Sequence, residues 1–134
     1  MQDVAMFAEK VYARKDLQGF QGDARFVRNE NAQKMFSKWR ASIGGIYAWR
    51  IQNPKSSADQ KRMLKEADFV FRQAFALCPS SPEALYRYVN ILVQDGRPDD
   101  GIRIGEAAQK VSPENKQLDQ LLIELRRIKA TLRK

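Results

Sequence analysis

The sequence predicts an all-α protein of about six helices, and three observations lead to this fold class. Apolar residues recur at three- and four-residue spacing and do not alternate as they would in a half-buried strand. Only seven glycines and five prolines interrupt this pattern. At 134 residues, 43% hydrophobic and 30% charged, the chain can bury the core of one domain.

Turn residues divide the apolar pattern into helices. A loop is expected at Gln52–Ser57, where Ser57 and Gln60 have the spacing of a capping box for the helix that follows. Pro79 and Pro82 stop that helix, because proline cannot continue it. The expected helices are Asp3–Lys15, Asn31–Ile51, Ala58–Leu77, Pro82–Gln94, Asp99–Val111 and Glu114–Leu132.

Two adjacent glycines, Gly44 and Gly45, fall in the middle of the second expected helix. Each costs about 1 kcal/mol relative to alanine in a helix interior, so helix propensity does not explain them. They indicate either a local kink or the close approach of another helix.

The residues of common catalytic and metal sites are scarce. The chain has no histidine and one cysteine, which excludes an internal disulfide, multi-cysteine metal sites and Ser-His or Cys-His catalysis. Asp99 and Asp100 follow a turn at a helix start, where acidic residues are ordinary capping chemistry, and the ligand spacing of a calcium loop is absent. We expect no cofactor, no metal and no enzymatic activity in this segment.

No stretch approaches the roughly 20 apolar residues that a membrane-spanning helix needs. The first ten residues also lack the basic-then-apolar order of a signal peptide. We therefore expect no membrane insertion by this segment.

The net charge of +8 is distributed unevenly along the chain. Residues 1–36 carry +1, residues 37–81 carry +5, residues 82–115 carry −2 and residues 116–134 carry +4. Basic side chains alternate with acidic ones and lack the interleaved aromatics of a single-strand binder, which disfavours nucleic acid as a partner. Binding to nucleic acid or to an anionic surface stays open as an alternative function.

An internal period of 34 residues relates Ala74 to Ala108 and Pro79 to Pro113. With this period, the chain resembles the tetratricopeptide repeat (TPR) family. The residues that match one whole motif are Pro82-Glu83-Ala84-Leu85, Gly96-Arg97-Pro98-Asp99-Asp100, Ala108 and Pro113-Glu114-Asn115. The residues that match another are Ile43-Gly44, Tyr47, Ala67, Phe71, Ala74 and Pro79, whereas Val89, Gly101 and Gly105 depart from the pattern.

The resemblance implies antiparallel helix pairs stacked as a short superhelix. Residues 1–36 would hold an N-terminal helix and the start of helix two, packing on the array at its N-terminal end. Residues 37–81 would form a TPR-like motif with an enlarged turn, and residues 82–115 a second motif. The capping helix would occupy residues 116–134.

The resemblance also implies a function, since such domains bind peptide segments on the concave surface of the first helix of each pair. Asn90 matches a position at which some members clamp a C-terminal carboxylate, but Gly45 stands at the equivalent position of the first motif, so we expect no complete clamp. The expected groove residues are Lys38, Trp49, Tyr86, Arg87, Asn90, Gln94, Glu124 and Arg127.

Trp49 and Tyr86 have two interpretations. Aromatic side chains are frequent binding anchors, but the first helix or the N-terminal loop could cover these two as core. We expect a non-enzymatic module that binds a protein or peptide. The second alternative to this function is a structural or self-association cap of a multidomain protein, which allows a homo-oligomer.

A further resemblance concerns the context of the chain. Asn31–Lys38, Tyr47–Arg50 and Glu66–Asn90 are similar to the C-terminal soluble TPR region of large bacterial multi-spanning membrane proteins of the glycosyltransferase type. In that case Met1 is not a native start, and the active site of the parent enzyme lies elsewhere. The expected location is the cytoplasm for a free-standing chain, and membrane-tethered or extracytoplasmic for part of such a protein.

Overall fold

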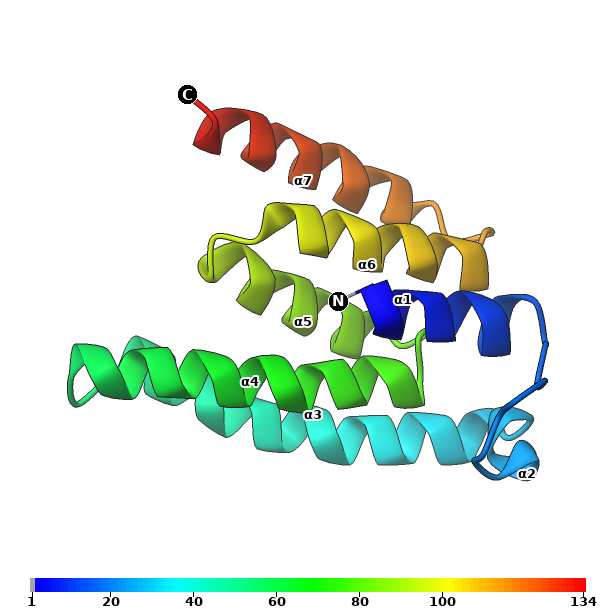
Figure 1. Cartoon of the computed structure of the whole chain (residues 1–134). Helices are drawn as coiled ribbons and strands as arrows, with labels where there is room; N and C mark the ends of the chain where they lie inside the picture. The colour runs from blue at the N-terminus through cyan, green and yellow to red at the C-terminus, as the bar shows by residue number, and fades with distance from the viewer. Residues whose placement is uncertain (1) are drawn as a thin grey trace.

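The helices from α3 to α7 are stacked side by side in chain order (Figure 1). The computed structural model describes residues 2–134 without the side chain of Gln2, and Met1 lies outside the described residues. No strand occurs within residues 2–134, so the predicted all-α class is confirmed. The helical elements are α1 (Gln2–Phe7), η1 (Ala8–Ala13), α2 (Ala24–Val27), α3 (Glu30–Gln52), α4 (Ser57–Leu77), α5 (Pro82–Gln94), α6 (Pro98–Val111) and α7 (Gln117–Leu132).

The short helix α2 was not predicted, because a helix of four residues is too short to show a periodic pattern. Asp23 caps it, accepting a hydrogen bond from the backbone N–H of Arg25 at 2.8 Å. The buried Gln33 of α3 donates from Nε2 to the carbonyls of Phe26 (3.0 Å) and Val27 (2.8 Å). These bonds fix the end of α2 against the start of α3.

The predicted capping box of α4 is wrong by one residue. The cap is Ser56, whose hydroxyl accepts from the N–H of Asp59 at 3.0 Å, while the Asp59 carboxylate accepts from the N–H of Lys55 at 3.2 Å. Gln60 instead donates to the carbonyl of Ile51 at 3.0 Å. An aspartate therefore takes the role for which the sequence pattern requires glutamate or glutamine.

The connection between α3 and α4 is short, which corrects the expectation of an enlarged turn. It spans only residues 53–56, and the additional residues lengthen the helices. The helices α3 and α4 have 23 and 21 residues, against 13 and 14 in α5 and α6.

The 34-residue period relates the ends of α4 and α6, which both finish with the backbone hydrogen bond common to helix ends. At the end of α4, the N–H of Cys78 donates to the carbonyl of Ala74 at 3.2 Å, and at the end of α6 the N–H of Ser112 donates to the carbonyl of Ala108 at 2.9 Å. Both alanines are fully buried. The two helix ends are therefore built alike.

The N-terminal helix lies elsewhere than expected. Together α1 and η1 pack against α6 and α4, and they do not cover the N-terminal end of the stack at α3 (Figure 1). The π-helical turn η1 carries Tyr12, whose hydroxyl donates to the carbonyl of Leu77 at 3.2 Å. Burial raises the pKa of Tyr12 to about 12, so the hydroxyl remains a donor at neutral pH.

Gly44 marks a close approach between helices, one of the two predicted explanations. A Cβ atom at Gly44 would lie 2.6 Å from the ring of Phe71 on α4, so the ring occupies the space of the missing side chain. The helix α3 continues through both glycines. Nearby, the buried hydroxyl of Ser37 donates to the carbonyl of Ala74 at 2.7 Å, which adds a polar contact between α3 and α4.

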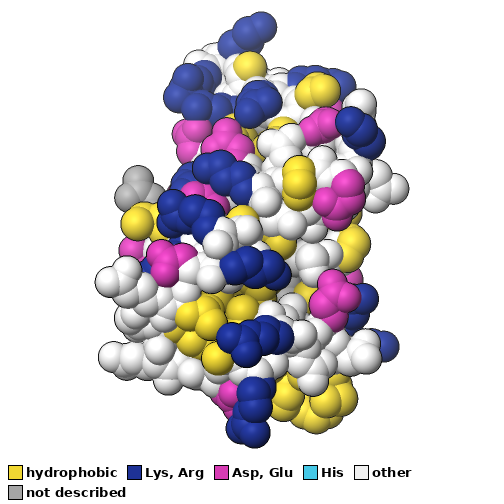
Figure 2. All heavy atoms as spheres, turned by 90° about the vertical axis from the view of Figure 1, so that its right-hand side faces the viewer, with side chains coloured by type: hydrophobic (Ala, Val, Ile, Leu, Met, Phe, Trp, Pro, Cys, Tyr) yellow, Lys and Arg dark blue, Asp and Glu magenta, His cyan; other side chains and the backbone are white. Residues whose placement is uncertain are grey.

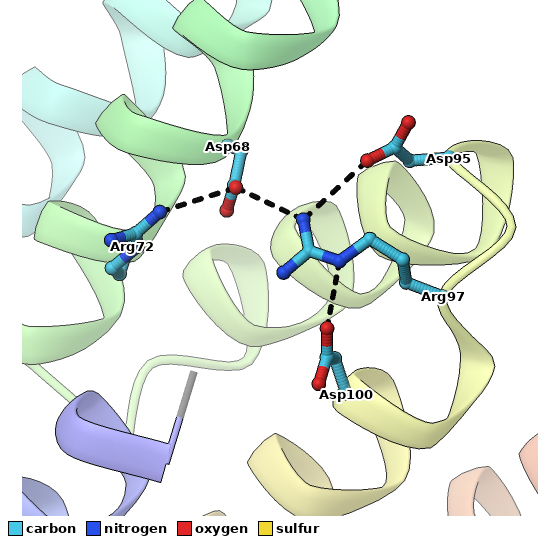
Figure 3. A network of polar contacts seen from close by, with 5 residues as sticks. All are labelled: Asp68, Arg72, Asp95, Arg97 and Asp100. Carbon is cyan, nitrogen blue, oxygen red and sulfur yellow. Dashed lines mark hydrogen bonds and ion pairs between the residues drawn. The ribbon is translucent and has the colours of Figure 1, made fainter.

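Arg97 connects three helices on the other side of the stack (Figure 3). Its guanidinium binds Asp68 of α4 at 3.0 Å, Asp95 at the end of α5 at 3.4 Å and Asp100 of α6 at 2.7 Å, and Asp68 also binds Arg72 at 3.2 Å. Although burial opposes the charged form, the hydrogen bonds to Asp100 and Asp68 raise the pKa of Arg97. The network fixes the α5–α6 turn against the first helix pair.

Two glycine substitutions should have opposite effects on stability. Gly44→Ala should lower the free energy of unfolding by about 1–3 kcal/mol, because the new methyl group overlaps the Phe71 ring. Gly101→Ala should raise it by up to about 1 kcal/mol, because its Cβ would meet Val89 and Leu125 at ordinary contact distances of 3.6–3.9 Å and alanine favours the helix. Urea unfolding measures both, and equal shifts would contradict the close approach at Gly44.

Glu9 of η1 should make the free energy of unfolding depend on pH. It is 15% exposed and pairs with Arg103 and, at 3.3 Å, with Lys110, both of α6. The hydrogen bond with Arg103 is the main cause that lowers the pKa of Glu9 below its ordinary value of 4.5, whereas burial acts in the opposite direction. The pair therefore stabilises the fold at neutral pH, and this contribution is lost as pH falls through the lowered pKa.

Glu9→Gln should accordingly reduce the free energy of unfolding by about 1–2 kcal/mol at neutral pH. The difference from the unmodified chain should shrink towards zero as pH falls through the lowered pKa of Glu9, because both side chains are then neutral. Urea unfolding measured from neutral to acidic pH tests this. A difference that does not change with pH would show that Glu9 acts through packing.

Candidate peptide-binding groove

A groove of about 410 Å³ lies between α3 and α5. On both α3 and α5, the residues that border the groove recur at three- and four-residue spacing, so they lie on one face of each helix. Its floor is apolar and its walls are polar. The lining residues are Gly45, Ala48, Gln52, Phe71, Arg87, Asn90, Ile91 and Gln94.

The structure brings together three of the eight residues expected in the groove, namely Arg87, Asn90 and Gln94 of α5. Lys38, Trp49 and Tyr86 are exposed but do not line this groove. Glu124 and Arg127 lie on α7, which packs against α6, and they pair with each other at 3.5 Å. They too lie outside the groove lining.

Trp49 and Tyr86 are not covered by the N-terminal helix. Trp49 is 65% exposed and Tyr86 is 36% exposed. Because α1 and η1 pack against α4 and α6, both aromatic side chains remain accessible to a partner.

Gly45 gives Arg87 room to cross towards α3. A Cβ atom at Gly45 would lie 2.9 Å from the Arg87 guanidinium nitrogen Nη1. From this position Arg87 donates to the carbonyl of Ala41 at 3.4 Å and pairs with Glu83 at 3.5 Å. The two adjacent glycines thus have different neighbours, Phe71 at Gly44 and Arg87 at Gly45.

Three amide side chains of the groove have unused hydrogen-bonding capacity. Gln52, Asn90 and Gln94 make no side-chain hydrogen bond with any described residue of the chain. Each amide offers two N–H donors and one carbonyl acceptor. A ligand in the groove can therefore form hydrogen bonds with them without displacing an internal partner.

Sequence reasoning missed Gln52, Ala48 and the Phe71 ring as lining residues. Ala48 follows Gly45 by three residues and Gln52 follows Ala48 by four, so this face of α3 could have been found from the helix period. The part played by Phe71 depends on the approach of α4 to Gly44, and no local pattern carries that information.

The remaining sequence-based expectations concern cofactors and membranes. Within the described residues, no three His, Cys, Asp or Glu side chains are grouped so that they could hold a metal ion. No described helix combines the length and apolar character needed to cross a bilayer. Cys78, the single cysteine, is 1% exposed.

No family model, curated protein or solved structure matches this chain.

Proposed function

We propose that this chain is a TPR-like interaction module that binds an extended peptide segment in the groove between α3 and α5. The observation that carries the proposal is the convergence of Arg87, Asn90 and Gln94, positions taken from the repeat motif, on one groove that also contains Gln52. The burial of both Ala74 and Ala108, 34 residues apart at the ends of α4 and α6, fits the repeat on which those positions rest.

The chemistry of the groove fits a polypeptide. Amide side chains can pair with both the N–H and the C=O groups of an extended backbone. The apolar floor formed by Ala48, Phe71 and Ile91 would accept an apolar side chain, and Arg87 favours an acidic group on the peptide. A volume of about 410 Å³ is within the range of ordinary ligand sites.

The proposed role is binding alone. The polar groups of the groove are amides and one guanidinium, which supply no nucleophile.

Replacing two amides should weaken peptide binding. Peptides selected from a random library on the intact chain are titrated into the protein by calorimetry. The double variant Asn90→Ala, Gln94→Ala should raise their Kd by roughly 5- to 100-fold, since two neutral hydrogen bonds contribute about 1–3 kcal/mol together. The matched control is Gln21→Ala, which removes an exposed amide in the loop before α2.

The control variant should bind with unchanged Kd. If the double variant and the control both bind like the unmodified chain, the selected peptides do not use this groove and the proposal fails. Unfolding by urea, measured on each variant, separates loss of binding from loss of structure.

A further inference from the structure

The helix α3 has a second accessible surface, which we call the outer face of α3. Six of its large apolar side chains are exposed, and their three- and four-residue spacing places them on one side of the helix. The opposite side, with Ser37, Ala41 and Gly44, is buried. The outer face consists of Met35, Phe36, Trp39, Ile43, Ile46 and Trp49.

The outer face is long and continuous. From Phe36 to Trp49 it extends about 20 Å along the helix axis. The ring of Phe36 packs edge-to-face against Trp39 at a centroid distance of 5.2 Å, and against Phe26 of α2 at 5.8 Å, so the apolar surface continues onto α2. An apolar surface of this kind on a soluble domain marks a site of contact with a protein or a membrane.

Basic side chains border this face. Lys38 and Arg40 precede and follow Trp39, so they lie about 100° to either side of it around the helix. Neither of these two side chains makes an ion pair with any residue of the described chain. Figure 2 shows hydrophobic side chains gathered at the lower edge of the molecule, near Lys and Arg side chains, where α2 and α3 lie in Figure 1.

The shape of the outer face suits a flat partner. Trp39, Ile46 and Trp49 are 57–65% exposed, so neighbouring elements do not enclose them in a groove. All three belong to α3, the helix at the end of the stack (Figure 1). Indole rings favour the boundary between lipid headgroups and acyl chains.

Charge favours a lipid surface over a second copy of this chain as the partner of the outer face. Pairing with the α3 of a second copy would bring two chains of net charge +8 together, with the basic borders of both faces at the interface. An anionic lipid surface instead offers phosphate groups to Lys38 and Arg40 and an apolar layer to the aromatic side chains.

We propose that the outer face of α3 docks the domain onto an anionic lipid bilayer. In this arrangement α3 lies parallel to the membrane plane, with its apolar side chains inserted among the headgroups and its basic borders on lipid phosphates. The surface is distinct from the α3–α5 groove, so the proposal goes beyond the proposed peptide binding.

Tryptophan fluorescence tests the proposal directly, because both tryptophans of the chain lie on this face. The full chain is mixed with vesicles of phosphatidylcholine alone or with phosphatidylglycerol, each carrying brominated acyl chains. We expect sedimentation with the anionic vesicles, quenching of tryptophan emission by bromine, and weaker binding as salt increases. Absence of binding to anionic vesicles at low salt, or binding without quenching, would overturn the proposal.

Matched variants locate the binding surface. Ile46→Asp should weaken vesicle binding on the order of tenfold, and Lys38→Glu with Arg40→Glu should do at least the same. Ile123→Asp on α7, where isoleucine is 57% exposed, is the control and should bind normally. Equal effects of Ile46→Asp and Ile123→Asp would contradict docking through α3.

Two further measurements separate this proposal from its alternatives. Light scattering without lipid should show a monomer; a dimer that Ile46→Asp dissociates, with no vesicle binding, would mean that a second copy covers the face. The double variant Asn90→Ala, Gln94→Ala should keep its affinity for vesicles. Loss of vesicle binding in that variant would assign the lipid contact to the groove and overturn the docking face.

Discussion

The packing of the first helix pair depends on the absence of a side chain at Gly44, and the path of Arg87 across α3 depends on the same absence at Gly45. The Phe71 ring fills the space beside Gly44, which brings α3 and α4 together, and Arg87 crosses over Gly45. Both side chains also line the α3–α5 groove. Methyl groups at these two positions would therefore change the helix contact and the shape of the groove at once, so stability and the candidate site share one constraint.

The same constraint explains why α3 has two accessible surfaces. Close contact with α4 buries Ser37, Ala41 and Gly44, and contact with α5 covers part of the adjacent side. Because α1 and η1 pack on α4 and α6, they leave the outer face of α3 exposed, and α2 borders this face at Phe36 through Phe26. One helix consequently borders a polar groove on one side and carries an apolar face with basic borders on another.

Local patterns predicted the helices well because the helix period and proline stops are short-range signals. The ends of α5 agree with the prediction, and Gly44 was correctly associated with a close approach. The position of α1 and η1 could not be predicted in this way, since it depends on long-range contacts. Val4, Ala5 and Ala8 are buried in the main core, and Glu9 pairs with residues about a hundred positions later in the chain. For the groove, the helix period placed Arg87, Asn90 and Gln94 on one face of α5. Lys38, Trp49 and Glu124 lie outside the groove because of the way the helices pack, which the period does not show.

The unequal lengths of the helix pairs have a consequence for motion. Since α3 has 23 residues and α5 has 13, α5 cannot support α3 along its whole length (Figure 1). Close to the turn that follows α3, Ile51 and Met63 are still buried as part of the main core. The turn itself, residues 53–56, is exposed. We therefore expect its backbone to open locally at a lower free energy than global unfolding, next to Gln52 at one end of the groove.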